Sequence, residues 1–175
     1  MLGTVLGSLG GLIALALLVA WWIGRRLPEQ HTATVTLRVD HPAPVVFALI
    51  SDPERLPAWR PDIKRLEVVE PHRRYREHGR FGPVVFAIET CTPPSDGPGH
   101  FTTRIVGERL KFGGCWRWTI EPTAGGAHIT VTEEGFIRPP VFRALARYIL
   151  GHTATLTAVL EALEAHLAAP PPPPG

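Results

Sequence analysis

Seven strand-like segments followed by one amphipathic segment constrain the fold of this chain more than any other feature of the sequence. Residues 32–39 alternate polar and apolar side chains, which is the period of a half-buried β-strand. Six further segments, bounded mostly by Gly and Pro, cover residues 63–70, 72–78, 83–92, 100–106, 111–121 and 127–137. Because short turns join most consecutive segments, we expect antiparallel strands.

The hydrophobic period changes at Pro139. Apolar residues and one histidine then recur every three or four positions, at 145, 149, 152, 156, 160, 163 and 167. This spacing predicts one face of a long amphipathic helix that ends before Pro170. Two short helices are expected between the first two strands, over residues 44–50 and from Pro53 to Trp59.

Together these elements predict an α+β fold in which a seven-stranded, curved antiparallel sheet surrounds the C-terminal helix, the helix-grip arrangement. A sheet of this size curls, and the helix lies in its concavity. Because one helix cannot fill that concavity, we expect a lined cavity between the helix and the sheet.

The N-terminal segment carries no charged residue from Leu2 to Ile23. A helix of these 22 residues would be about 33 Å long, enough to cross a hydrocarbon core of about 30 Å. Two Trp residues close the run, and Arg25 and Arg26 follow, as at a membrane interface. Residues 1–27 are therefore predicted to be a transmembrane anchor with the domain on the cytoplasmic side. A cleaved signal peptide is the alternative, although such peptides begin with basic residues.

Gly3, Gly7 and Gly11 lie one helical turn apart within this run. Small residues at that spacing let two membrane helices approach closely, which predicts a homodimer; a loosely packed single anchor is the alternative. Residues 28–169 form the predicted domain. The proline-rich tail, residues 170–175, is either a polyproline II segment or an unstructured end.

Composition excludes several classes of function. A net charge of +2 and 19% charged residues do not indicate nucleic-acid binding. Cys91 and Cys115 form no CxxC pair and have no His at metal-ligand spacing, so no metal is expected. They are predicted to be buried free thiols, or a disulfide if their strands are neighbours. Motifs for nucleotide cofactors and for serine or zinc hydrolases are missing as well, so no cofactor is expected.

Basic residues concentrate in the first third of the predicted domain, at Arg60, Lys64, Arg65, Arg73, Arg74, Arg76 and Arg80. On a tethered protein such a patch would suit anionic lipid headgroups, at about 1 kcal/mol per residue near the surface. The alternative is an ordinary solvated face.

Three stretches resemble the SRPBCC superfamily, the START-like and polyketide-cyclase type of protein. Residues 44–59, PVVFALISDPERLPAW, are similar to its pair of short helices ending in Trp. Residues 126–135 are similar to its late strand, and residues 142–167 to its closing helix. The resemblance covers roughly residues 32–168. It implies a fold used by lipid carriers, hormone-binding proteins and aromatase/cyclases, and it implies no universal catalytic residue.

The wall of the predicted cavity is mostly apolar. Trp116 and Trp118 share a face with Ile120, and their stiff rings suit a ring-bearing or acyl ligand. Further ligand-binding candidates, from the strand 100–106 and the long helix, are Phe101, Thr103, Ile105 and Leu156. The alternative is that these side chains only fill the core.

Glu133 and His152 are the candidate polar groups of this interior, and Tyr75 is a weaker one. Glu133 shares a face with the inward residues of the last strand, where an unpaired carboxylate is costly or takes up a proton. His152 lies on the apolar face of the long helix. If both reach the cavity, they would transfer protons at a ketone or enol, the step that a cyclase needs. Otherwise Glu133 lies in water at the strand end and His152 is a core residue.

The sequence therefore predicts a membrane-anchored, non-catalytic binder or carrier of a hydrophobic small molecule, such as a lipid or a polyketide-like compound. Two alternatives remain: an aromatase/cyclase-type enzyme that uses Glu133 and His152, and an interaction protein without a ligand.

Overall fold

A computed structural model describes residues 2–79 and 82–169 of the chain, with side chains from residue 10 onward. The helical elements are α1 (Leu2–Arg26), α2 (Ala43–Ser51), the 3₁₀ turn η1 (Pro53–Arg55), α3 (Leu56–Trp59), α4 (Pro140–Leu145), the π-helical turn η2 (Ala146–Leu150) and α5 (Ala154–Ala168). The strands are β1 (Gln30–Val39), β2 (Arg65–Glu70), β3 (Arg74–Gly79), β4 (Gly82–Thr92), β5 (Gly99–Val106), β6 (Phe112–Thr123) and β7 (Gly126–Ile137). The proline-rich tail lies outside the described residues.

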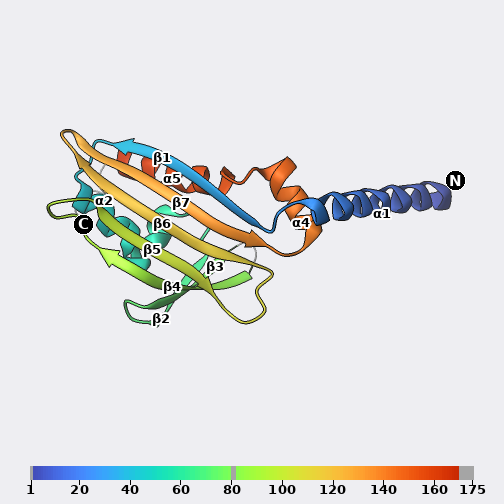
Figure 1. Cartoon of the computed structure of the whole chain (residues 1–175), viewed down its shortest axis with the longest axis horizontal. Coiled ribbons are helices and arrows are strands. Elements are labelled where there is room, and N and C mark those ends of the chain that lie inside the picture. The colour runs from blue at the N-terminus through green and yellow to red at the C-terminus, as the bar shows by residue number, and fades with distance from the viewer. Residues whose placement is uncertain (1, 80–81, 170–175) are drawn as a thin grey trace.

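The strands form one antiparallel sheet in the order β1-β7-β6-β5-β4-β3-β2, so the first strand pairs with the last. This confirms the predicted seven-stranded sheet. The sheet curves beneath α2 and α5 (Figure 1). Register places apolar side chains side by side on its inner face: Ile129 of β7 is opposite Leu37 on β1 and Ile120 on β6.

The predicted pair of short helices is also confirmed. The Asp52 carboxylate accepts the backbone N–H of Glu54 at 3.0 Å and thereby starts η1. The indole N–H of Trp59 donates to the carbonyl of Leu49 at 3.2 Å. Trp59 therefore ties the second short helix to the end of α2, which itself packs on β5, β6 and β7.

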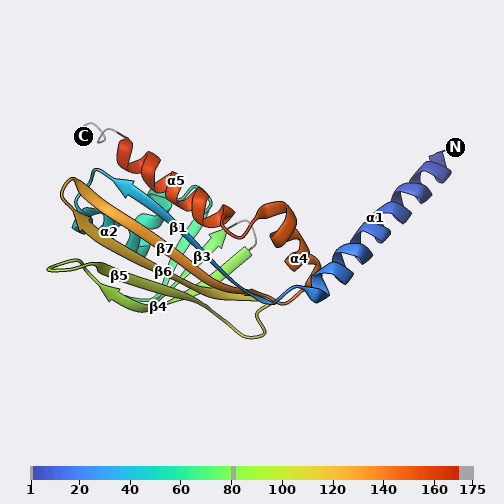
Figure 2. The same cartoon turned by 45° about the horizontal axis from the view of Figure 1, so that its top comes forward.

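The predicted long C-terminal helix is interrupted. Leu156 and Leu163 of α5 are completely buried, as expected, but Ile149 of η2 is 72% exposed. Gly151 separates the two parts, with a φ of 77° that glycine adopts without the steric cost of a Cβ. The part before Gly151 leaves the sheet because α4 packs against α1 instead (Figure 2).

Contacts between α1 and α4 are close. A Cβ on Gly24 would lie 1.8 Å from the carbonyl oxygen of Pro140, so only glycine permits this approach. Buried Arg143 donates from Nε to the carbonyl of Gly24 at 2.9 Å and from Nη1 to Glu29 at 2.8 Å. The guanidinium thus adds a second donor to a carbonyl in the last turn of α1, which also accepts the backbone N–H of Leu27 at 3.2 Å.

The predicted transmembrane anchor is not confirmed. α1 leaves the domain at the end where α4 lies (Figures 1 and 2), and its side chains from Leu12 to Trp22 are mostly exposed. Within the described part of the chain, no helix is both long enough and apolar enough to cross a bilayer. Of the three glycines predicted to pair two helices, Gly11 is exposed with open space beside it. Gly3 and Gly7 lie outside the residues whose side chains are described.

Candidate functional site

The predicted ligand-binding residues fall into two sets that differ in burial. Phe101, Thr103 and Trp118 of the sheet and Leu156 of α5 are buried in the core. Their role in packing is therefore shown, and contact with a ligand would require the helices to move. The second set, half-buried and within reach of solvent, consists of Ile105, Trp116, Glu133 and His152.

A polar cluster of three side chains lies on this inner face. His31 of β1 has its Nε2 atom 3.6 Å from the Oε1 atom of Glu133. The His31 ring stacks on the ring of His152, with centroids 4.4 Å apart and an interplanar angle of 20°. The structure therefore brings the two predicted polar residues together through a third residue, and we call these three the His31–Glu133–His152 cluster.

Gly135 provides the space that His31 occupies. It is the register partner of His31 on β7, and a Cβ at Gly135 would lie 2.6 Å from the Cε1 atom of His31. The sequence pattern did not predict His31 because it places the start of the first strand at residue 32. Extending the alternation of Ala33 and Val35 by one period would have found it.

Burial lowers the pKa of His152, and the nearby His31 and Arg147 lower it further. The Glu133 carboxylate acts in the opposite direction. The His152 imidazole therefore favours the neutral state, in which one ring nitrogen can accept a hydrogen bond or a proton.

A second polar group lies toward the β2 edge of the sheet. Buried Arg60 donates from Nη1 to Glu77 at 3.1 Å and from Nη2 to Asp62 at 2.6 Å. Burial raises the pKa of Glu77, while Arg60 opposes that shift. Beside them, buried Tyr75 stacks on Phe86 at 5.3 Å, and burial raises the pKa of its hydroxyl. Tyr75 is thus part of the core and keeps its proton at neutral pH.

Trp116 lies between the two polar groups. It is the register partner of Glu133 across β6 and β7. The guanidinium of Arg60 lies 5.8 Å from the centre of its ring. Three further half-buried apolar side chains border the core on this side of the sheet, namely Leu66, Phe86 and Ile88. We call Trp116 and these three residues the apolar strip.

Most arginines of the basic patch predicted on this part of the chain lie beside acidic residues. Arg65 and Arg76 pair with Glu67, at 2.7 and 2.9 Å. Arg73 and Arg74 lie within 4 Å of Glu70, at 3.6 and 3.9 Å. Arg80 lies outside the described residues. Four arginines thus share two carboxylates, so these ion pairs reduce the positive charge of this face without cancelling it.

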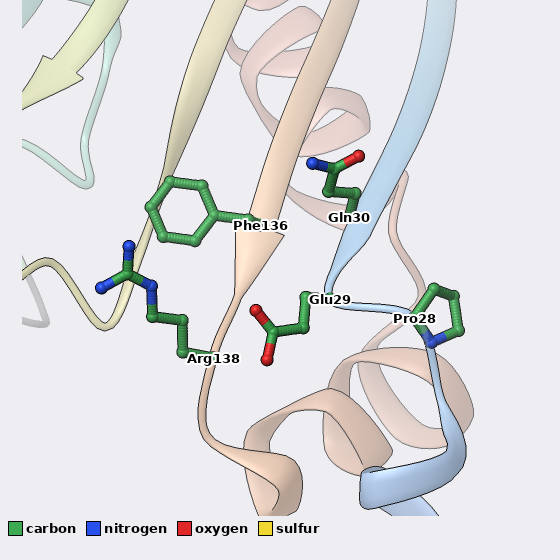
Figure 3. Close-up of a pocket in the computed structure, with 5 residues that line it drawn as sticks. All are labelled: Pro28, Glu29, Gln30, Phe136 and Arg138. Carbon is green, nitrogen blue, oxygen red and sulfur yellow. The ribbon is translucent and has the colours of Figure 1, made fainter.

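Two hollows lie at opposite ends of the sheet. The first, of about 420 Å³, is lined by Pro28, Glu29, Gln30, Phe136 and Arg138, beside the start of β1 (Figure 3). The second, of about 340 Å³, lies at the opposite end of these strands, around Val39 and Pro122. Neither hollow is lined by the His31–Glu133–His152 cluster or by the apolar strip.

Both cysteines are free: Cys91 is exposed and Cys115 is buried. The disulfide alternative is therefore wrong, and the prediction that both thiols are buried holds only for Cys115.

A curved antiparallel sheet around a C-terminal helix, with a few polar groups on an apolar inner face, defines the helix-grip class of ligand-binding folds. The chain belongs to the polyketide cyclase/dehydrase and lipid transport family, whose model matches residues 30–168. This match confirms the superfamily that the short-helix pair, the last strand and the closing helix indicated.

Solved structures support the same fold. A truncated norcoclaurine synthase from Thalictrum flavum superposes with a TM-score of 0.62 and 13% identity, covering 81% of this chain and 95% of its own. A START superfamily protein from Mycobacterium smegmatis superposes with a TM-score of 0.59 and 19% identity, covering 80% of this chain and 97% of its own. A hypothetical protein from Helicobacter pylori superposes with a TM-score of 0.62 and 15% identity, covering 83% of this chain and 91% of its own. Among curated proteins no significant match is found.

Proposed function

We propose that this protein binds a hydrophobic small molecule along the apolar strip and holds the molecule's polar end at the His31–Glu133–His152 cluster. The observation that carries the proposal is the position of Trp116. Its half-buried ring lies between Glu133 and the other three residues of the apolar strip. Ligand sites in proteins combine such apolar walls with a few convergent polar groups.

Binding in this account requires a movement of the helix above the site. The residues from η2 to the start of α5 supply His152 and precede the buried Leu156. Gly151, with its positive φ, is a suitable hinge because it has no Cβ to clash. Opening at Gly151 would separate His152 from His31 and uncover the inner face beside Glu133.

The second part of the proposal is that α1 attaches the protein to a membrane. The uncharged run from Leu2 to Ile23 supports it, as do the exposed apolar side chains of α1. The guanidinium groups of Arg25 and Arg26 lie over the rings of Trp21 and Trp22, 4.7 and 3.5 Å from their centroids. Trp and Arg together are typical of the boundary between lipid and water. Pairing of two α1 helices through the glycine stripe stays a prediction.

The test of ligand binding is native mass spectrometry of the full chain released from a mild detergent. We expect a co-purified hydrophobic molecule on the wild type, much less on a Trp116→Ala variant, and no change with the control Val69→Ala on the exposed side of β2. Unfolding curves of both variants establish that they fold. A wild-type protein that is consistently empty would contradict the proposal and favour an interaction protein.

The test of attachment is the fractionation of cells that express the full chain or a variant lacking residues 1–26. We expect the full chain in carbonate-washed membranes and the shortened chain in the supernatant. A shortened chain that stays with the membranes, or a full chain that washes off, would contradict attachment by α1.

A second candidate function, proton transfer at a ketone or enol, is favoured by the Glu133 carboxylate lying 3.6 Å from His31, whose ring stacks on that of His152. Its test is the exchange of the α-protons of a hydrophobic ketone, such as α-tetralone, in deuterated water. An enzyme would accelerate the exchange, and Glu133→Gln would reduce it at least tenfold. Equal rates with and without protein would leave only the binding function.

A further inference from the structure

Four large apolar side chains are exposed on the segment that leaves the sheet. Phe142 of α4 is 59% exposed, and Tyr148, Ile149 and Leu150 of η2 are 67%, 72% and 64% exposed. We call these four residues the α4–η2 surface. Single exposed apolar residues are common, but a group of four within nine residues of chain marks an interaction site.

The position of this surface is fixed relative to α1. Gly24 contacts the backbone of Pro140, and Arg143 joins the carbonyl of Gly24 to Glu29. Both views show α4 at the base of α1, at the end of the sheet from which α1 leaves (Figures 1 and 2). A bilayer that contains α1 would therefore face this end of the domain.

The surroundings of the surface are basic. No Asp or Glu occurs between Glu134 and Glu161, whereas Arg138 and Arg147 are exposed there. Arg25 and Arg26 at the end of α1 add two further positive charges. In contrast to the arginines of β2 and β3, none of these four has an acidic partner among the described residues.

We propose that the α4–η2 surface docks on an anionic membrane surface, with its apolar side chains between lipid headgroups and its arginines on lipid phosphates. The inference rests on the proposed attachment through α1. Charge complementarity and continuity with α1 identify the occupant as anionic lipid. A second copy of the chain would bring the same arginines face to face. Docking would place Gly151 and the start of α5 next to the bilayer.

The experiment uses the full chain reconstituted into phosphatidylcholine vesicles with or without one quarter phosphatidylglycerol. Cys91 is replaced by Ser, and a single bimane label is placed at Ile149→Cys, at Leu18→Cys on α1, or at Val69→Cys as the water-exposed control. Quenching by a doxyl-labelled lipid reports contact with lipid, and quenching by iodide reports contact with water. Buried Cys115 is left in place.

The proposal predicts that the Ile149→Cys label is quenched by doxyl lipid and at least threefold less by iodide than the Val69→Cys label. The effect should weaken without phosphatidylglycerol and in an Arg138→Gln, Arg147→Gln variant. An Ile149→Cys label open to iodide while the Leu18→Cys label contacts lipid would overturn docking and leave attachment intact. No lipid contact at either label would overturn both. Protection from iodide that persists in detergent without lipid contact would indicate a second copy, and would overturn the membrane proposal.

Discussion

The imidazole rings of His31, near the start of β1, and His152, just before α5, stack with their centroids 4.4 Å apart. The two residues are far apart in the sequence but adjacent in the fold. Glu133 of β7 lies 3.6 Å from His31. The stack therefore depends on the segment around Gly151 remaining closed over the sheet. A change in the charge of either ring should affect this closed state.

Acid should destabilise the protein through His152. Its pKa is lowered in the folded state, so as the pH falls the unfolded chain binds the proton first, near the ordinary value of about 6.5. Stability is then lost as the pH falls from about 6.5 to the folded pKa. In urea unfolding, the free energy of unfolding should fall between pH 8 and pH 5, and it should fall less in His152→Gln than in the wild type. Equal pH dependence in both proteins would contradict the assignment.

The charges around His152 should tune its pKa in opposite directions. Glu133 raises the pKa of His152, so Glu133→Gln should lower it further, whereas Arg147→Gln should raise it because Arg147 lowers it in the wild type. NMR titration of the His152 ring C–H signals measures both shifts. Shifts of the same sign in the two variants would be inconsistent with this geometry.

Truncation of Leu156 and of Ile149 should have unequal effects on stability. Leu156 is completely buried, so Leu156→Ala should cost about 2–5 kcal/mol by creating a cavity. Ile149 is exposed, and Ile149→Ala should change the free energy of unfolding by less than about 0.5 kcal/mol. Urea denaturation of both variants checks the break at Gly151. Similar losses would indicate one continuous helix on the sheet.

Enlarging Gly24 should detach α1 from α4. A methyl group there would overlap the carbonyl of Pro140, whereas Gly11 has open space, so Gly11→Ala is the matched control. Limited trypsin cleavage after Arg25 and Arg26 should be several times faster in Gly24→Ala than in the wild type or the control. Unchanged cleavage would show that this contact does not hold the two helices together.

Most of the sheet could be predicted from local pattern, because strand alternation and Gly- or Pro-rich turns depend on near neighbours in the chain. The seven segments correspond to β1 to β7 with ends that differ by a few residues. The break in the C-terminal helix could not be predicted from local pattern, because it depends on α4 packing against α1, a contact between distant segments. The periodic spacing of Leu145, Ile149 and His152 does not show that α4 packs against α1 and not against the sheet.

The candidate site was predicted in part. Glu133 and His152 were identified from the faces on which they lie, but their connection through His31 depends on the register of β1 with β7 and on the space left by Gly135. Likewise, the charge of Arg60 and its neighbours suggested a basic patch. Only the structure shows that acidic partners lie beside these arginines and reduce the charge of the patch.

The central claim is that a hydrophobic molecule lies beside Trp116 with its polar end at the His31–Glu133–His152 cluster. It is tested most directly by NMR of the full chain in detergent during titration with 2-naphthol. We predict saturable shifts of the Trp116 indole N–H and of the His31 and His152 ring signals, while Trp21 and Trp22 report partition into the detergent. Shifts confined to Trp21 and Trp22, with Trp116 and both histidines unchanged at saturating 2-naphthol, would contradict the claim.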